Sequence, residues 1–116
     1  MKKISLFTLL LLMAFSSVIA QEKINKLRAP PYLKQGDTIA IVAPAGILKN
    51  REGSIKKAIE LAESWSLHVI LGKNVFNQNN HFAGTDAERA ADFQEALDTK
   101  SIKAIWTARG GYGSVR

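Results

Sequence analysis

Thr38-Ile39-Ala40-Ile41-Val42-Ala43 is an almost continuous run of apolar residues, several of them β-branched. A strand with one face in solvent alternates apolar and polar residues, whereas a strand covered on both faces, as in a parallel sheet, is apolar throughout. Gly36-Asp37 before the run predicts a turn, and Pro44-Ala45-Gly46 after it ends the strand. We therefore expect a buried parallel strand over residues 38–43.

A helix and a second strand are predicted to follow. Ser54 is a candidate N-cap for a helix over residues 55–64, because its hydroxyl can accept a hydrogen bond from a first-turn amide. Residues 67–71 predict a strand ended by Gly72, in which His68 is more simply a packing or edge residue than a catalytic one. The apolar residues at helical spacing, all expected in the core, are Ile55, Ala58, Ile59, Ala62 and Trp65.

A loop, a second helix and a third strand come next. Residues 73–84 predict an asparagine-rich loop, Thr85 with Glu88 fits the capping box that starts a helix, and residues 102–107 predict a strand. The expected inner face of the helix consists of Ala90, Phe93, Gln94 and Leu97. The helix carboxylates, interpreted as a solvated face and as capping groups, are Asp86, Glu88, Asp92, Glu95 and Asp98.

The order strand, helix, strand, helix, strand favours an α/β fold with a parallel sheet and right-handed crossovers. We expect a three-layer domain of the flavodoxin or Rossmann type over residues 36–116. Three parallel strands leave exposed edges, and a glycine-rich loop follows the third strand without a covering helix. The domain is therefore expected to be incomplete, truncated after its third strand.

Residues 1–20 match a secretory signal peptide. Lys2 and Lys3 form a positive n-region, an apolar run follows at residues 6–15, and Val18-Ile19-Ala20 fits a cleavage site. An uncleaved anchor is the alternative, and a lipoprotein is disfavoured because the chain has no cysteine. We expect an exported, periplasmic protein that is not held at the membrane once the leader is cleaved, with residues 21–35 as an extended lead-in.

Composition removes several classes of function. Without cysteine there are no disulfides, thiolate nucleophiles or zinc–thiolate sites. The formal charge of +6 falls to +4 when Lys2 and Lys3 leave with the leader, and no basic run carries interleaved aromatics, so nucleic-acid binding is not indicated. No metal-ligand spacing is present, and no cofactor is expected.

The segment Arg109-Gly110-Gly111-Tyr112-Gly113-Ser114 is the best candidate site. Ligands of open α/β sheets bind beyond the carboxyl ends of the strands, where this loop is expected to meet residues 44–46 and 73–84. Glycine amides can approach an anion or a developing oxyanion closely, and Arg109 and Arg116 supply positive charge beside them. A tight turn that needs positive φ explains the glycines equally well. The loop matches no phosphate-binding pattern.

Ser114 is a poor candidate nucleophile. Its flanks do not fit G-x-S-x-G, and no histidine follows it to act as base, since His68 and His81 both come earlier. We interpret Ser114 as the start or cap of a following helix.

Over about residues 28–116 the sequence resembles the LD-carboxypeptidases (murein tetrapeptide carboxypeptidases) and the related self-immunity peptidases. Residues 33–45 (LKQGDTIAIVAPA) are similar to the family's opening strand. Residues 82–89 (FAGTDAER) are similar to its FAGTD-x-ER segment, and residues 91–97 continue that helix. Ile105-Trp106 followed by Arg109-Gly110-Gly111-Tyr112-Gly113 is similar to its RGGYG signature.

The resemblance implies a serine peptidase with a Ser-His-Glu triad that releases terminal D-alanine from murein tetrapeptides by cutting an L-to-D bond. It places the nucleophile in a later G-[YFH]-S-D elbow, and the glutamate and histidine in a second domain, so all three are expected beyond Arg116 and this fragment is expected to be inactive. It assigns oxyanion and substrate binding to Gly110 and Gly111, and more loosely to Arg109 and Tyr112. The full-length protein is a possible homodimer.

Two other functions remain open on the sequence. The first is a non-catalytic exported module that binds a peptide or sugar fragment in the same cleft, which a stop codon directly after Arg116 would favour. The second is nucleotide binding, which the absent phosphate motif and the leader disfavour.

Overall fold

The computed structural model describes residues 29–116. The predicted leader (1–20) and the first part of the lead-in (21–28) lie outside the described residues. The order of elements is β1 (Thr38–Val42), α2 (Glu52–Ser64), β2 (His68–Leu71), α3 (Asp86–Asp98), β3 (Ile102–Thr107) and the short 3-10 helix η2 (Tyr112–Val115). The predicted alternation of strands and helices is confirmed.

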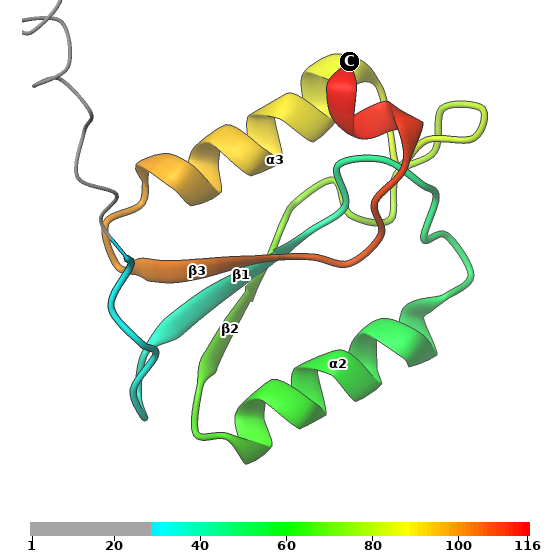
Figure 1. Ribbon diagram of the computed structural model, residues 1–116. Helices are drawn as coiled ribbons and strands as arrows, with labels where there is room; N and C mark the ends of the chain where they lie inside the picture. Colours follow the sequence, from blue (N-terminus) through cyan, green and yellow to red (C-terminus); the bar gives the residue numbers. More distant parts are fainter. Residues whose placement is uncertain (1–28) are drawn as a thin grey trace, which may run out of the picture. The chain divides into compact units, whose positions relative to one another are not determined.

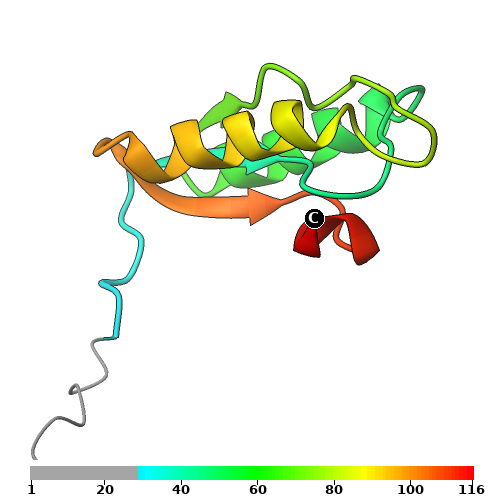
Figure 2. The same ribbon diagram turned by 90° about the horizontal axis from the view of Figure 1, so that it is seen from above.

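The three strands form one parallel sheet in the order β2-β1-β3, with β1 at its centre (Figure 1). Ile39 pairs with Val69 of β2 on one side and with Ala104 of β3 on the other. The sheet runs against α3 on one face and α2 on the other, so the fold has the three layers expected from the sequence (Figures 1 and 2). Both faces of the central strand are therefore covered, which is why its sequence does not alternate.

The alternation of β1 side chains decides which helix each contacts. Ile39 lies in an apolar cluster with Ala62 of α2, whereas Ala40 and Val42 lie in a cluster with Ala96 of α3. Ile41 is completely buried. Burial of these side chains removes apolar surface from water on both faces of the sheet, and this is the main favourable contribution to folding.

Helix α2 begins earlier than predicted, whereas its end at Ser64 is as expected. Its N-cap is Arg51, which forms no side-chain cap, so Ser54 lies inside the helix rather than capping it. The helix ends at Ser64, and Trp65 is 56% exposed instead of in the core. Spacing predicted burial of Trp65 wrongly because the chain leaves helical geometry there, with Ser66 at φ 61°.

Helix α3 starts as predicted but presents another face. Thr85 accepts a hydrogen bond from the Glu88 amide, and Glu88 accepts one from the Thr85 amide, which confirms the capping box. The buried residues are Arg89, Asp92 and Ala96. Of the predicted inner face only Phe93 is half-buried, because Ala90, Gln94 and Leu97 are exposed. The apolar pattern indicated the wrong face since two charged residues occupy the buried one.

The start of the sheet is a turn, as expected. Gly36 has φ 86°, a conformation that favours glycine, and its amide donates to the Ser66 carbonyl. Residues 32–35 of the lead-in are exposed, with Tyr32 95% accessible. Within the described part of the chain, no helix is both long and apolar enough to cross a membrane.

Candidate functional site

The strand order creates a natural place for a ligand. From β1 the chain passes through α2 to β2 on one side, and then crosses through α3 to β3 on the other side. The carboxyl ends of β1 and β3 lie next to each other, where the Ala108 amide donates to the Val42 carbonyl at 2.9 Å. This is the topological switch point at which open α/β sheets bind ligands.

The three loops expected at this edge do meet. The Ala83 amide donates to the Ala45 carbonyl at 2.9 Å, which joins the loop before α3 to the loop after β1. Arg109 Nη1 donates to the Ile47 carbonyl at 3.1 Å, which joins the loop after β3 to the same segment. Figure 2 shows η2 beyond the carboxyl end of β3.

The glycines of residues 109–116 meet different surroundings. Gly113 is buried, and a Cβ there would lie 2.8 Å from Phe82 Cδ1 and 3.0 Å from Ala45 Cα, so only glycine fits. Gly111 has φ 136°, and at this position a turn that needs glycine is part of the explanation. Gly110 has open space around its Cα.

The amides of Gly110 and Gly111 are available to a ligand. Both residues are exposed, and within residues 29–116 neither main-chain N–H donates a hydrogen bond. Uncommitted amides held at fixed positions can stabilise an anion or a developing oxyanion. The arrangement therefore suits the chemistry expected for these two residues.

Arg109 and Tyr112 flank these amides in different states. The Arg109 side chain lies over Gly46, where a Cβ would come within 2.7 Å of its Nε, and its Nη1 is engaged by Ile47. Part of its guanidinium is thus used to hold the loop after β1. Tyr112 is 76% exposed and free to contact a bound molecule.

Ser114 lies in η2, inside a 3-10 turn rather than at the start of an α-helix. It lines a cavity of about 420 Å³ between α3 and the end of β3, together with Phe93, Thr107 and Arg116. His68 and His81 are exposed in β2 and in the loop before α3, and neither lines this cavity. A positioned base for Ser114 is thus absent from the described residues.

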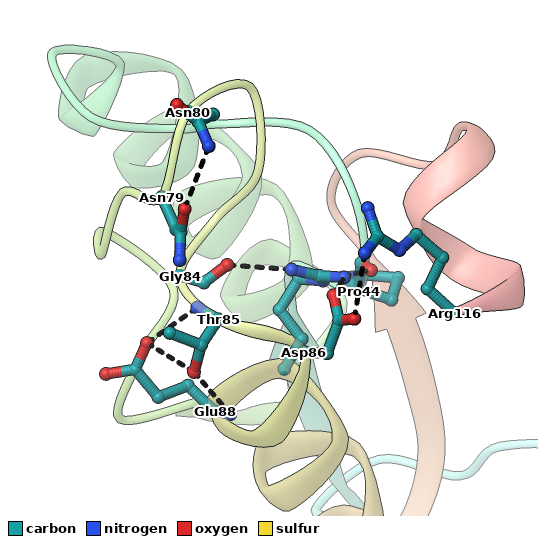
Figure 3. A network of polar contacts seen from close by, with 9 residues as sticks. Pro44, Asn79, Asn80, Gly84, Thr85, Asp86, Glu88 and Arg116 are labelled. Carbon is teal, nitrogen blue, oxygen red and sulfur yellow. Dashed lines mark hydrogen bonds and ion pairs between the residues drawn. The ribbon is translucent and has the colours of Figure 1, made fainter.

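Arg89 is a buried residue of this region that no sequence pattern singled out. Its side chain is 3% exposed, and it donates from Nε to the Pro44 carbonyl at 2.9 Å and from Nη1 to the Gly84 carbonyl at 2.7 Å. It also forms an ion pair with Asp86, whose other carboxylate oxygen contacts Arg116 at 3.3 Å (Figure 3). The sequence FAGTDAER contains a sign of its importance. Arg89 is a positive residue in the first turn of a helix, where the helix dipole favours acidic residues.

A second polar network fixes the loop before α3. Asp92, predicted as part of a solvated face, is instead 6% exposed and accepts from the Asn74 amide at 2.9 Å and from Asn74 Nδ2 at 2.8 Å. It is buried because Asn74 supplies the hydrogen bonds that a carboxylate requires away from water. At the start of α3, the Thr85 amide and hydroxyl both donate to the Glu88 carboxylate (Figure 3). These hydrogen bonds, that of the amide most strongly, lower the pKa of Glu88 from its ordinary value.

The sequence also matches a known protein family. The sequence model of the LD-carboxypeptidase N-terminal domain matches residues 39–116, which include the sheet, both helices and the glycine-rich loop. The chain belongs to the LD-carboxypeptidase family. The resemblance drawn from the sequence motifs is therefore confirmed, and it is confirmed for the N-terminal domain.

Three curated relatives of this LD-carboxypeptidase domain are similar in sequence. Identity is 37% over 87 residues to the probable murein peptide carboxypeptidase of Bacillus subtilis, covering 75% of this chain and 27% of the relative. It is 35% to a putative carboxypeptidase of Streptomyces coelicolor, covering 79% and 30%. It is 31% to the murein tetrapeptide carboxypeptidase of Pseudomonas aeruginosa, covering 65% and 24%. The chain thus spans less than a third of the length of these relatives.

Solved structures agree with the family fold. The microcin C7 self-immunity protein MccF in its wild-type apo state superposes with a TM-score of 0.68 at 26% identity, covering 76% of this chain and 26% of that one. An MccF-like protein from Bacillus anthracis gives 0.61 at 29% identity, covering 76% and 27%. The parallel α/β architecture is therefore shared with these proteins.

Proposed function

We propose that the full-length protein carrying this chain is an exported serine carboxypeptidase that hydrolyses the L-to-D peptide bond before the terminal D-alanine of murein tetrapeptides. The observation that carries the proposal is the pair of uncommitted amides, Gly110 and Gly111, at the switch point of the sheet. Family membership supports the substrate class, and so do the names of two relatives, a probable murein peptide carboxypeptidase and a murein tetrapeptide carboxypeptidase.

In the proposed reaction, a serine beyond Arg116 attacks the carbonyl carbon of the residue before the terminal D-alanine. A histidine takes the serine proton, and the carbonyl oxygen becomes an oxyanion as its π bond opens. The N–H groups of Gly110 and Gly111 donate to that oxygen. When the oxyanion collapses, the C–N bond breaks, the D-alanine amine receives the proton from histidine, and water then hydrolyses the acyl-enzyme.

Two neighbouring residues are assigned to substrate binding. The Arg109 nitrogens not engaged by Ile47 offer positive charge to the terminal carboxylate of the peptide. The exposed Tyr112 ring offers an apolar surface beside the amides. Charge and ring thus sit next to the amides that would hold the reacting carbonyl.

The cellular location follows from the leader predicted at residues 1–20. Murein lies outside the inner membrane, so an exported enzyme meets the polymer directly. Comparing the amino terminus of the protein recovered from the periplasm with that of the full chain tests this, and a mature protein that begins at Gln21 is expected.

The proposed activity is tested by incubating the full-length protein with a murein tetrapeptide and quantifying free D-alanine. The matched substrate is the same tetrapeptide ending in L-alanine, which should not be cleaved. Release of D-alanine alone supports the proposal. Tight binding of the tetrapeptide without release would instead favour the non-catalytic binding module.

A further inference from the structure

Arg89 is an energetically unusual residue. Its side chain is almost fully buried and lies in the first turn of α3, where the helix dipole disfavours positive charge. Replacing a buried ion pair by well-packed apolar residues is often neutral or stabilising. Rules of local stability are broken mainly where a site requires it. The contacts of Arg89 therefore indicate what it is needed for.

Those contacts connect α3 to the loop after β1. Arg89 donates to the Pro44 carbonyl at 2.9 Å, and to the Gly84 carbonyl at 2.7 Å in the segment leading into α3. The residue after Pro44 is Ala45, whose carbonyl accepts from Ala83. One guanidinium thus ties together the two segments beneath the glycine-rich loop.

A second set of contacts runs through Phe82. The guanidinium carbon of Arg89 lies 4.7 Å from the centroid of the Phe82 ring, and that of Arg116 lies 5.4 Å from it. Both distances are within the range of cation–π attraction. Asp86 bridges the same two arginines with its two carboxylate oxygens. Figure 3 shows its contact with Arg116.

Phe82 and Ala45 are the surface on which the glycine-rich loop rests. A Cβ on Gly113 would lie 2.8 Å from Phe82 and 3.0 Å from Ala45, and one on Gly111 would lie 3.8 Å from Ala45 Cβ. Close packing against Phe82 and Ala45 therefore restricts the positions available to the loop that carries the Gly110 and Gly111 amides. The guanidinium of Arg89 contacts the ring of one support and the residue next to the other.

We infer that Arg89 is a positioning residue for the oxyanion-binding amides, and that it acts through Pro44-Ala45 and Phe82 without touching the substrate. This role rests on the proposed carboxypeptidase function. Lysine cannot replace it, because a single ammonium group cannot reproduce the planar fork that reaches Pro44, Gly84 and Asp86 together.

The test is Arg89→Lys in the full-length protein, with Arg51→Lys as the matched control on the exposed N-cap of α2. We expect Arg89→Lys to lower kcat for D-alanine release by about 100-fold, as a displacement of about 1 Å in a reacting group does. KM should change by less than about threefold, since uniform substrate binding is retained. Arg51→Lys should leave kcat and KM unchanged.

Amide hydrogen exchange gives a readout that does not depend on activity. In Arg89→Lys, exchange over residues 108–116 should become about tenfold faster, while exchange over Glu52–Ser64 stays at the wild-type rate. A folded Arg89→Lys protein with wild-type kcat and wild-type exchange over 108–116 would overturn the inference.

Two other results are possible: the Arg89→Lys variant does not fold, or the wild-type protein has no activity. If Arg89→Lys does not fold, Asp86→Asn removes the carboxylate that bridges Arg89 and Arg116, and it should speed exchange over 108–116 and lower kcat in the same direction. Unchanged values in folded Asp86→Asn would then overturn the inference. If the wild-type protein releases no D-alanine, the proposed function fails, and loop exchange alone decides whether Arg89 holds the loop.

Discussion

The two helices that cover the sheet are held by different chemistry. Helix α2 packs through apolar contacts, such as Ala62 with Ile39, and starts at Arg51 without a side-chain cap. Helix α3 starts with a capping box and buries Arg89 and Asp92 in its first two turns. The α2 side supplies core, whereas the amino end of α3 supplies directed hydrogen bonds beneath the glycine-rich loop. Within the described residues, the buried charged side chains thus lie at the amino end of α3, next to the loop that carries the candidate site.

The largest expected effect lies on the α2 side of the central strand. Ile41→Ala removes a completely buried side chain and leaves a cavity, so unfolding free energy should fall by about 2–5 kcal/mol. Urea unfolding of the full-length protein measures this. Leu61→Ala, at a position 46% exposed on α2, should stay within about 0.5 kcal/mol of wild type. Equal losses in the two variants would contradict the assignment of the core.

On the α3 side, the expected loss of unfolding free energy comes from the removal of buried hydrogen bonds. Asp92→Ala removes the acceptor of the Asn74 amide and the nearer of the two acceptors of Asn74 Nδ2, which should cost about 1–3 kcal/mol. A double-mutant cycle with Asn74→Ala isolates the interaction, and a coupling of about 0.5–3 kcal/mol is expected. Additive losses would show that the two residues act independently.

The α2 side of the sheet could be predicted from the sequence more fully than the α3 side. The apolar run of β1 predicts a parallel strand covered on both faces, because such a strand needs no alternation of apolar and polar residues. Its central position in the order β2-β1-β3 is seen only in the structure. The capping box at Thr85 and Glu88 was predictable, since it is a local pattern with local hydrogen bonds. The inner face of α3 was not predictable, because the partners of Arg89 and Asp92 come from distant loops.

The candidate site likewise has features that the sequence predicts and features that depend on tertiary contacts. The meeting of three loops was predictable, because alternating strands and helices indicate a parallel sheet whose strands end at the same edge. The difference between Gly113, which is enclosed by Phe82 and Ala45, and Gly110, which is open, depends on tertiary contacts that no local pattern encodes. The same holds for Arg109, whose hydrogen bond to the Ile47 carbonyl joins residues far apart in the sequence.

The two glycines provide the next test. Gly113→Ala places a methyl group 2.8 Å from Phe82 Cδ1, and such overpacking should cost about 1–3 kcal/mol and displace the loop. Gly110→Ala meets nothing within 4 Å and should be close to neutral in stability. Thermal unfolding measures the stability of both variants. A destabilised Gly110→Ala together with an unchanged Gly113→Ala would contradict the assignment of Gly113 as the enclosed glycine.

The helix starts give a smaller effect. Thr85→Ala removes the hydroxyl that accepts from the Glu88 amide and should cost about 1 kcal/mol. Arg51→Ala removes no cap and should be neutral. Chemical denaturation distinguishes the two, and similar values would mean that the capping box contributes little.

The smallest expected effect depends on pH. The folded-state pKa of Glu88 is lowered by the Thr85 amide, so its contribution to stability is fully present above about pH 4.5 and is lost as the pH falls through the lower folded-state value. Glu88→Gln should be less stable than wild type at pH 7 and should approach it at acid pH. A difference that stays constant from pH 7 into the acid range would contradict this origin.

Whether the amides of Gly110 and Gly111 bind the oxyanion is tested most directly by a crystal structure of the full-length protein with a peptide boronate. The boronate carries boron in place of the reacting carbonyl and becomes tetrahedral when the serine adds to it. We expect one boronate oxygen within about 2.7–3.1 Å of the Gly110 or Gly111 amide nitrogen. A serine adduct whose oxygens all contact other groups would contradict the account.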